Sequence, residues 1–283
     1  MNETLSIRLR VTTMVRLLLT LSVLACGTTS HAEDPQGIVG GVLTAPTAGL
    51  SHEPNRLAIV IDDLGYSRQR DQRALMLPGE LTFAVLPAAP NARDFATSAV
   101  AAGKEIILHQ PMQTVGQPHV HEQGALHSEL SQQQFTDTLS NNLRALPGIV
   151  GLNNHRGSLL TASTDAMDQV MAQLAGQNLY FLDSRTTAAT VAHDTAKHWG
   201  VPTLKRDVFL DHVRTPQAVA AEFRRALGIA RKQGFAVLIA HPHTVSLDYL
   251  EQALRDLPAD IETVTLSELL PATNSGRRQT FGR

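Results

Sequence analysis

The sequence predicts an α/β protein whose strands run parallel, either as a closed barrel or as a doubly wound sheet. From about residue 56 to about residue 270, strand-like runs alternate with helical periods, which is the order expected of repeated β-α units. The first run, residues 57–61, is apolar throughout and rich in β-branched residues, as a strand buried on both faces requires. The predicted strands lie at 57–62, 81–87, 105–111, 149–155, 178–184, 203–207, 236–242 and 262–266.

Three of the helices between these strands have recognisable ends or apolar faces. Ser131, with Gln134 three residues later, forms a capping box that predicts the start of one helix. A second helix is predicted to begin at Thr215-Pro216 and to end before Gly234, because proline suits the first helical position and glycine the position after the last. The side chains expected to line the core are Phe135, Leu139, Leu143 and Leu146 on the first helix, Val219, Phe223, Leu227 and Ala230 on the second, and Met167, Val170, Met171 and Leu174 on a third.

The two ends of the chain are expected to lie outside this domain. Residues 1–32 have the pattern of an export signal, with arginines before a short apolar run and small residues at the cleavage position. Cleavage after Ala32 predicts a protein exported across the inner membrane to the periplasm. The alternatives are lipoprotein processing at Cys26 or a retained membrane anchor. Residues 33–55 predict a flexible linker and residues 271–283 a disordered tail.

The composition excludes several classes of function. The net charge is −2 and aromatic residues make up 4% of the chain, so there is neither a basic tract for nucleic acid nor a supply of rings for base stacking. The apolar run of the signal is too short to form a stable membrane span. Cys26 is the single cysteine, so a protein cleaved after Ala32 has no disulfide and relies on its core. Nothing in the sequence predicts a protein partner.

Polar residues terminate five of the predicted strands. Because the carboxyl ends of parallel strands meet at one edge of a sheet, we expect these side chains to converge on one mouth. The residues concerned are Asp62 and Asp63 after the first strand, His109 in the third, Asn153, Asn154 and His155 in the fourth, Asp183 and Arg185 in the fifth, and His241 and His243 in the seventh.

This set of residue types predicts metal-assisted hydrolysis. Two or three histidines with one carboxylate suit Zn²⁺ or a similar divalent ion and leave a position open for water and substrate. A second carboxylate beside the ion would take a proton from water, and a histidine opposite would protonate a leaving group. A serine hydrolase is disfavoured because the chain has no Gly-x-Ser-x-Gly motif. His119, His121 and His127 lie in a loop rich in Gly, Gln and Pro and are expected to be solvated.

Over residues 56–270 the chain resembles the divergent polysaccharide deacetylases, an offshoot of the NodB-type carbohydrate esterases. The resemblance implies a single-domain, distorted seven-stranded (β/α) barrel. In the parent family one strand ends in a pair of aspartates, matched here by Asp62 and Asp63, which implies that Asp62 is the general base and Asp63 a metal ligand. The parental apolar strand that ends in a histidine is matched by the run ending at His241, which implies that His241 is the general acid.

The third strand matches the parental pattern only in part. His109 matches the first metal-binding histidine of the parental motif, but Gln113 stands where the second should be. The Asn-Asn-His-x-Gly-Ser segment at 153–158 resembles the signature of the divergent group, and we expect His155 to supply the missing ligand from the next strand. Four further residues are expected around the metal or against the substrate: Asn154, Asp183, Arg185 and His243. Of these, Asp183 and Arg185 are expected to orient His241 or to bind the substrate.

The resemblance implies a metal-dependent hydrolase of the cell envelope that removes acetyl groups from N-acetylated sugars of a polysaccharide or peptidoglycan, with Zn²⁺ as the expected ion. Gln113 leaves open an alternative, a non-catalytic envelope module that binds glycan or protein with the same fold. Hydrolysis of a phosphoester ranks third, because few basic residues follow the strands beyond Arg156, Arg185 and Arg206.

Overall fold

The computed structural model describes residues 53–116 and 122–271. The predicted export signal at 1–32, almost all of the predicted linker at 33–55, and the tail after residue 271 lie outside the described residues, as do His119 and His121. The first strand begins at Asn55, so the last residue assigned to the linker belongs to the sheet.

In the described part of the chain, nine strands form one sheet, and all neighbouring strands pair in parallel. The order is β6-β5-β4-β3-β2-β1-β8-β7, with β9 paired to β1 as well. The strands are β1 (Asn55–Leu64), β2 (Thr82–Val85), β3 (Glu105–Met112), β4 (Gly151–Arg156), β5 (Tyr180–Asp183), β6 (Thr203–Lys205), β7 (Val208–Phe209), β8 (Phe235–Ala240) and β9 (Ile261–Val264). All eight predicted strands are therefore present.

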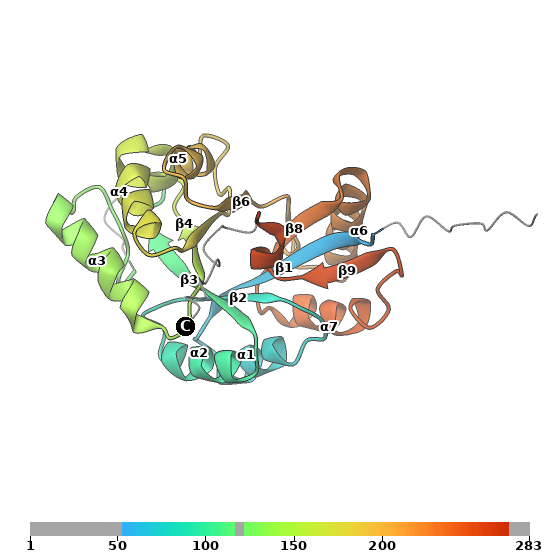
Figure 1. Cartoon of the computed structure of the whole chain (residues 1–283). Coiled ribbons are helices and arrows are strands. Elements are labelled where there is room, and N and C mark those ends of the chain that lie inside the picture. The colour runs from blue at the N-terminus through green and yellow to red at the C-terminus, as the bar shows by residue number, and fades with distance from the viewer. Residues whose placement is uncertain (1–52, 117–121, 272–283) are drawn as a thin grey trace, which may run out of the picture. The chain divides into compact units, whose positions relative to one another are not determined.

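Strand β1 is the centre of the sheet because three strands share its two edges. Along one edge it pairs with β8, and along the other it pairs with β9 over its first residues and with β2 over its last. Figure 1 shows β1 in blue between these neighbours. Residues 57–61 are fully buried, as their apolar run predicts.

The predicted strand at 203–207 is the first part of a kinked stave that runs on to Phe209 and serves two neighbours. Its first part, β6, pairs with β5, and its second part, β7, which lies beyond the predicted range, pairs with β8. The two residues between them carry the backbone across: the amide of Arg206 donates to Asp183 O at 3.0 Å, and the amide of Asp207 donates to Val237 O at 2.9 Å. With β6 and β7 counted as one stave, the strands β1 to β8 make the distorted (β/α)7 barrel that the resemblance predicts, in a single domain.

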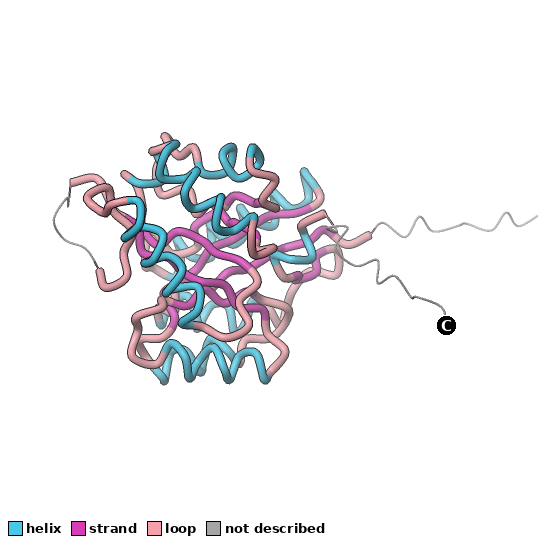
Figure 2. The backbone as a smooth tube through the Cα atoms, turned by 60° about the vertical axis from the view of Figure 1, so that its left-hand side comes forward, coloured by secondary structure: helices cyan, strands magenta, loops and turns pink. Residues whose placement is uncertain are grey.

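Helices cover the outside of the strands, as Figure 2 shows in cyan around magenta. The three predicted helix ends are confirmed: Ser131 and Gln134 form the capping box, Thr215 caps a helix that begins at Pro216, and Gly234 ends that helix with φ of 88°. The predicted core faces of the three helices are buried. The helices are α1 (Arg68–Leu75), α2 (Ala92–Ala101), α3 (Gln132–Ala145), the 3-10 turn η1 (Leu160–Ala162), α4 (Thr164–Ala175), α5 (Ala192–His198), α6 (Pro216–Gln233), α7 (Thr244–Ala253) and α8 (Leu266–Leu269).

Candidate metal and catalytic site

Strand periodicity decides which side chains enter the mouth of the barrel. Successive side chains of a strand point to opposite faces, so residues two apart share a face. Apolar residues inside the barrel form one buried cluster, separate from the layer packed under the helices. In β1, β3 and β8 the inward positions run on to the predicted site residues, Asp62, His109 and His241, and in β4 the same face carries Asn153 and His155. The inner cluster consists of Ala58, Val60, Ala84, Ile107, Tyr180, Leu182, Val237, Ile239, Val264 and Leu266.

A β-bulge turns the second aspartate toward the same mouth. The register between β1 and β2 shifts between Ile61 and Leu64, so the aspartate pair lies at an irregularity inside the strand. Asp63 has a φ of 59°, in the left-handed region that non-glycine residues seldom occupy. Asp71 braces the turn that follows, since its Oδ2 accepts hydrogen bonds at 3.2 Å from the amides of Gly65 and Ser67.

Three ligand atoms converge where the sequence predicts a metal. Asp63 Oδ1 lies 3.2 Å from His109 Nε2 and 2.9 Å from His155 Nδ1, and the two nitrogens are 3.0 Å apart. Zinc bonds of about 2.0–2.1 Å in a tetrahedral arrangement place neighbouring ligand atoms roughly 3.3 Å from each other. The three atoms are thus already close to the spacing that a tetrahedral ion requires.

Asp63 Oδ1 is also a buried oxygen that no hydrogen bond satisfies. The Nδ1 of His155 lies close to it, but the hydrogen bond of that nitrogen is with His109 Nε2. Burial would raise the pKa of Asp63, but the two imidazoles outweigh it and hold the pKa far below its ordinary value. Asp63 is therefore ionised, and the positive charge beside its Oδ1 is that of His155; a divalent cation held by the same three atoms would replace that charge, so these residues fit a divalent metal.

Asn153 fixes the orientation of His109 and links it to Asp62. Its Oδ1 lies 2.7 Å from His109 Nδ1, and its Nδ2 donates to Asp62 Oδ1 at 2.9 Å. Because the amide oxygen can only accept, His109 Nδ1 carries the proton and Nε2 presents its lone pair to Asp63 and His155. The tautomer that metal binding needs is therefore built into the buried core of the mouth.

Asp62 lies between the metal ligands and the opposite wall of the mouth. Burial raises the pKa of this carboxyl, and attraction from His109 and His241 offsets part of the rise. Asn153 occupies Oδ1, while Oδ2 lies 3.7 Å from His109 Nε2. A carboxylate with a raised pKa beside a metal cluster is suited to accept a proton from water near neutral pH.

His241 faces this cluster and is held by a carboxylate that the sequence analysis missed. His241 Nδ1 lies 2.8 Å from Asp211 Oδ1, and Asp211 Oδ2 accepts from the His241 amide at 2.7 Å and from Ser246 Oγ at 2.6 Å. Although burial favours the neutral imidazole, Asp211, with smaller contributions from Asp62 and Asp63, raises the pKa of His241 to about 9. His241 is therefore protonated at neutral pH and presents its Nε2 proton away from Asp211.

A column of stacked side chains supports His241 from the kinked stave. The guanidinium carbon of Arg206 lies 3.7 Å from the centre of the Phe209 ring. The Phe209 and His241 rings stack with centroids 6.0 Å apart, and His241 and His243 stack at 5.6 Å. The column fixes the plane of the His241 ring and places His243 on its outer side.

Comparison with known proteins identifies the fold family. A family model described as divergent polysaccharide deacetylase matches residues 59–270. The chain belongs to the divergent polysaccharide deacetylase family. An uncharacterized protein of Haemophilus influenzae is 38% identical over 226 residues, covering 80% of each chain, and the uncharacterized protein YibQ of Escherichia coli is 38% identical over 215 residues, 76% of this chain and 67% of YibQ. The crystal structure of an uncharacterized protein from Agrobacterium tumefaciens superposes with a TM-score of 0.74 at 26% identity, covering 77% of this chain and 90% of that one.

Gln113, the departure from the parental deacetylase motif, serves the loop rather than the metal cluster. Its Oε1 accepts a hydrogen bond from the Ser128 amide at 2.8 Å, and its backbone oxygen accepts from the amides of Leu159 and Leu160. His155 on the neighbouring strand brings a second imidazole nitrogen to Asp63 Oδ1 instead. In this member of the family the two histidines that meet Asp63 therefore come from two strands, β3 and β4.

Glu122 is a further residue of the site that sequence reasoning did not single out. Its Oε2 lies 3.4 Å from His155 Nε2, and its Oε1 lies 3.1 Å from an Arg156 nitrogen. Burial lowers the pKa of His155, but Asp63 and Glu122 outweigh it and raise the pKa to about 9. His155 must lose that proton to bind a metal, because only the neutral imidazole offers a lone pair.

The remaining predicted residues occupy other places around the mouth. Asn154 points away from the cluster: its Oδ1 accepts from the Ser184 amide and its Nδ2 donates to Arg156 O. Asp183 accepts from the Arg185 amide and from Thr190 Oγ1, so the expectation that Asp183 orients His241 is wrong and Asp211 does so instead. The Arg185 side chain is exposed. His127 is half-buried rather than solvated.

In the described part of the chain, no helix is both long enough and apolar enough to cross a membrane.

Proposed function

We propose that this divergent deacetylase is a metal-dependent hydrolase of the cell envelope that removes acetyl groups from N-acetylated sugars of a polysaccharide or peptidoglycan. The observation that carries the proposal is the pairing of two unlike groups across one mouth. On one side Asp63 Oδ1 converges with two imidazole nitrogens without a hydrogen bond of its own. On the other side His241 is protonated and oriented by Asp211.

The metal would be held by Asp63, His109 and His155, a set of one oxygen and two nitrogen donors that suits Zn²⁺. A divalent ion bound there supplies a Lewis acid for the acetyl carbonyl and lowers the pKa of water. Asp62, adjacent in sequence and tied to His109 through Asn153, accepts the proton of the attacking water.

His241 supplies the proton that lets the sugar amine depart. Its Nδ1 proton is engaged by Asp211, so the proton it gives up is the one on Nε2. Amide hydrolysis needs such a donor because an amine leaves poorly without protonation. Asp62 and His241 both face the metal cluster from separate strands, so one can take the proton of the attacking water while the other protonates the departing amine.

Two observations support a carbohydrate as the substrate. The family to which the chain belongs is one of polysaccharide deacetylases. Tyr66, three residues after Asp63, is 56% exposed and offers an aromatic surface against which the apolar face of a sugar ring can pack. The envelope location follows from the export signal predicted at residues 1–32.

The test is to measure metal content and acetate release from chitooligosaccharides and from peptidoglycan. We expect bound metal in the purified protein and a loss of about 10²–10⁴-fold in the rate of acetate release in Asp62→Asn, the typical contribution of a general base. Asp137→Asn, an exposed acid on α3, is the matched control and should be as active as the wild type. Absence of metal together with equal rates in wild type and Asp62→Asn would refute the proposal.

A non-catalytic envelope module is the second candidate, and Gln113 is the observation that favours it. Because Gln113 is turned to Ser128, the third strand offers one imidazole instead of two. This candidate predicts binding of a glycan or protein that persists in EDTA and in Asp62→Asn. Any EDTA-sensitive hydrolysis of an amide or ester by the wild type excludes it.

A further inference from the structure

The loops that follow β5, β6 and β7 present exposed cations beside the proton donor. We call Arg185 and Arg214 the cationic arc. Both are exposed: Arg214 follows β7, which pairs with β8, and Arg185 follows β5 and accepts a hydrogen bond at its backbone oxygen from Arg206, the residue that stacks on Phe209 beside His241. Burial lowers the pKa of His243, attraction from Asp211 offsets part of that change, and Arg214 lies near enough for its repulsion to add to the lowering. Burial and then repulsion from Arg185 lower the pKa of Arg206 to about 10.

The acidic residues of the same loops are turned inward and satisfied by backbone amides. Asp183 accepts from the Arg185 amide at 2.8 Å, and Asp207 accepts from the Val237 amide at 2.8 Å. Asp211 accepts from the His241 amide at 2.7 Å. These carboxylates therefore hold the backbone in place by hydrogen bonds, and the charge that these loops expose to a substrate is positive.

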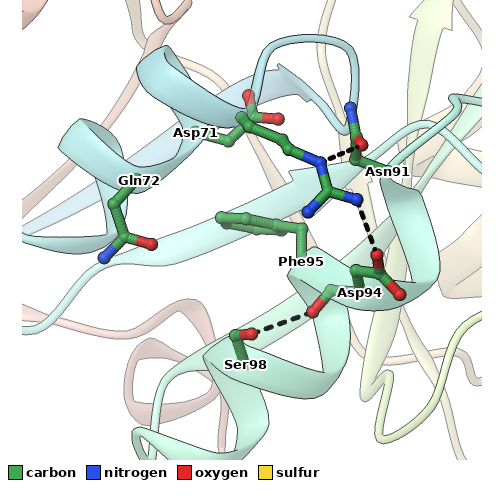
Figure 3. A pocket seen from close by; sticks show the side chains of 7 residues that line it. Asp71, Gln72, Asn91, Asp94, Phe95 and Ser98 are labelled. Atoms are coloured by element: carbon green, nitrogen blue, oxygen red, sulfur yellow. Dashed lines mark hydrogen bonds and ion pairs between the residues drawn. The ribbon is translucent and has the colours of Figure 1, made fainter.

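The arginines of the cationic arc differ from Arg68 and Arg156 in lacking a carboxylate partner, and from Arg206 in being exposed. Arg68 donates to Asn91 Oδ1 at 2.7 Å and to Asp94 Oδ2 at 3.0 Å, contacts drawn as dashed lines in Figure 3. Arg156 pairs with Glu122 at 3.1 Å. Within residues 53–116 and 122–271, neither Arg185 nor Arg214 forms a salt bridge.

Arg185 is also held in a strained backbone conformation. Its φ is 50°, and among the described residues only four non-glycine residues have positive φ. Three of the four, Asp63, Arg156 and Arg185, stand at the mouth end of a strand; Asp63 belongs to the metal cluster, and Arg156 pairs with Glu122, which contacts His155. A left-handed non-glycine residue costs of order 1–3 kcal/mol and persists where surrounding contacts enforce it, often at ligand sites.

We propose that the cationic arc binds a carboxylate of the substrate, so that the protein acts on an acidic N-acetylated glycan in preference to a neutral one. This inference rests on the proposed function, since it names the substrate class of the same mouth. Arginine matches a carboxylate with two parallel N–H donors, and an unpaired exposed arginine gives up no existing ion pair on binding. The arc lies on the His241 side, so the carboxylate would sit on the leaving-group side of the scissile amide.

The test compares two tetrasaccharides of equal length by calorimetry on the full chain carrying Asp62→Asn, which prevents turnover. One is chitotetraose, which is neutral, and the other alternates N-acetylglucosamine with N-acetylmuramic acid and has no peptide. We expect the acidic probe to bind about tenfold more tightly or better, with the difference shrinking at high salt. Arg185→Gln and Arg214→Gln should each weaken the acidic probe about tenfold and leave the neutral probe within about twofold.

Arg144→Gln is the matched control, because Arg144 is exposed at the carboxyl end of α3, remote from the mouth. Equal affinity of the wild type for both probes, or an equal loss for both probes in the arginine variants, overturns the inference. The outcome is separable from that of the proposed function. Arginine-dependent binding of the acidic probe without acetate release by the wild type upholds the arc and refutes the deacetylase. Acetate release from both probes at equal efficiency, unaffected by Arg185→Gln, upholds the deacetylase and refutes the role of the cationic arc.

A second pair of variants separates binding from folding. Arg185→Gly and Asn178→Gly each replace a left-handed residue, at the two opposite ends of β5, by the residue that adopts this conformation freely. Both should raise the melting temperature, because both remove strain. Only Arg185→Gly should weaken binding of the acidic probe, and equal affinity of the two glycine variants for that probe counts against the inference.

Discussion

The mouth of the barrel contains two groups with the same composition, one aspartate and two histidines, and opposite states of hydrogen bonding. In the first group, Asp63 Oδ1 meets His109 and His155 and has no hydrogen bond of its own. In the second, Asp211 lies with His241 and His243, and it accepts from one imidazole, one backbone amide and one hydroxyl. Residue type alone does not separate them.

The difference shows that the number of hydrogen bonds accepted by the aspartate decides whether each group suits a metal or a proton. An aspartate whose oxygens already accept three hydrogen bonds has little to offer a cation, but it holds a proton firmly on its histidine. Asp63 Oδ1 instead lies among two imidazole nitrogens, where a divalent cation can take the place of the His155 proton. One group is therefore suited to a metal and the other to proton transfer, and the following predictions test that division.

The largest expected effect is on metal binding by variants of the two aspartates. Asp63→Asn should lower the affinity for Zn²⁺ by more than about 100-fold, because loss of an indirect partner alone typically costs about 10–100-fold. Asp211→Asn should leave the affinity unchanged, since Asp211 already has three donors. Competition with a chromogenic chelator measures both. A fall in affinity in Asp211→Asn equal to that in Asp63→Asn would mean that the two groups are not distinct.

Asn153→Ala should weaken metal binding about 10–100-fold without removing any ligand. The cause is release of His109, whose Nδ1 loses the acceptor that fixes its tautomer. Long-range ¹⁵N–¹H spectra of the imidazole report the tautomer directly in the metal-free protein. Asn154→Ala is the control, since Asn154 bonds Ser184 and Arg156 instead. An unchanged His109 tautomer in Asn153→Ala would contradict the role given to Asn153.

The pH dependence of acetate release should follow His241. Its pKa of about 9 in the folded protein predicts activity that declines above pH 9, as the acid loses its proton. Asp211→Asn should move this alkaline limb toward the ordinary histidine value near 6.5, with a loss of about 30-fold at pH 8. Profiles of kcat/KM against pH measure the shift. An alkaline limb at the same pH in both proteins would exclude His241 as the acid.

The same pair affects stability with a definite sign. Because the pKa of His241 is raised on folding, the Asp211–His241 contact stabilises the fold fully below about pH 6.5 and loses that contribution as pH rises through about 9. The gap in free energy of unfolding between wild type and Asp211→Asn should therefore narrow from pH 6 to pH 9.5. Denaturant titrations at the two pH values measure it.

The smallest effect is expected where the parental ligand is restored. Gln113→His should add no metal affinity, because the side chain at this position faces Ser128 rather than Asp63. It should lower the free energy of unfolding by about 1 kcal/mol through loss of the hydrogen bond to the Ser128 amide. A gain in metal affinity would show that the third strand can still supply its second histidine.

The sequence predicted the fold and most of the site because strand periodicity and strand ends are local properties. The parity that buries Val60 and Ile107 also points Asp62 and His109 into the barrel, and an apolar run ending in a histidine places His241. The same parity selects Asn153 rather than Asn154, a distinction available from the sequence but not drawn from it.

Two residues of the site, Asp211 and Glu122, could not be predicted from the sequence, for physical reasons. Asp211 follows β7, the second part of the kinked stave. The charged pair Arg206-Asp207 resembles the end of a strand, so the sequence does not indicate that a second strand follows and ends at Phe209. Glu122 approaches His155 from a loop whose course depends on the packing of several elements. No spacing along the chain encodes such an approach.

Because of the kinked stave, the two sides of the mouth are supported by strand pairings of unequal length. His109 and His155 stand on adjoining strands, with β3 and β4 in register from Leu108 to Met112, whereas β7 contributes two residues, Val208 and Phe209, to its pairing with β8. Phe209 is also the ring on which His241 leans. The pairing of β7 with β8 is therefore expected to open more readily than that of β3 with β4. His241 could then shift to fit substrates of different width, while the spacing of His109 and His155 stays fixed.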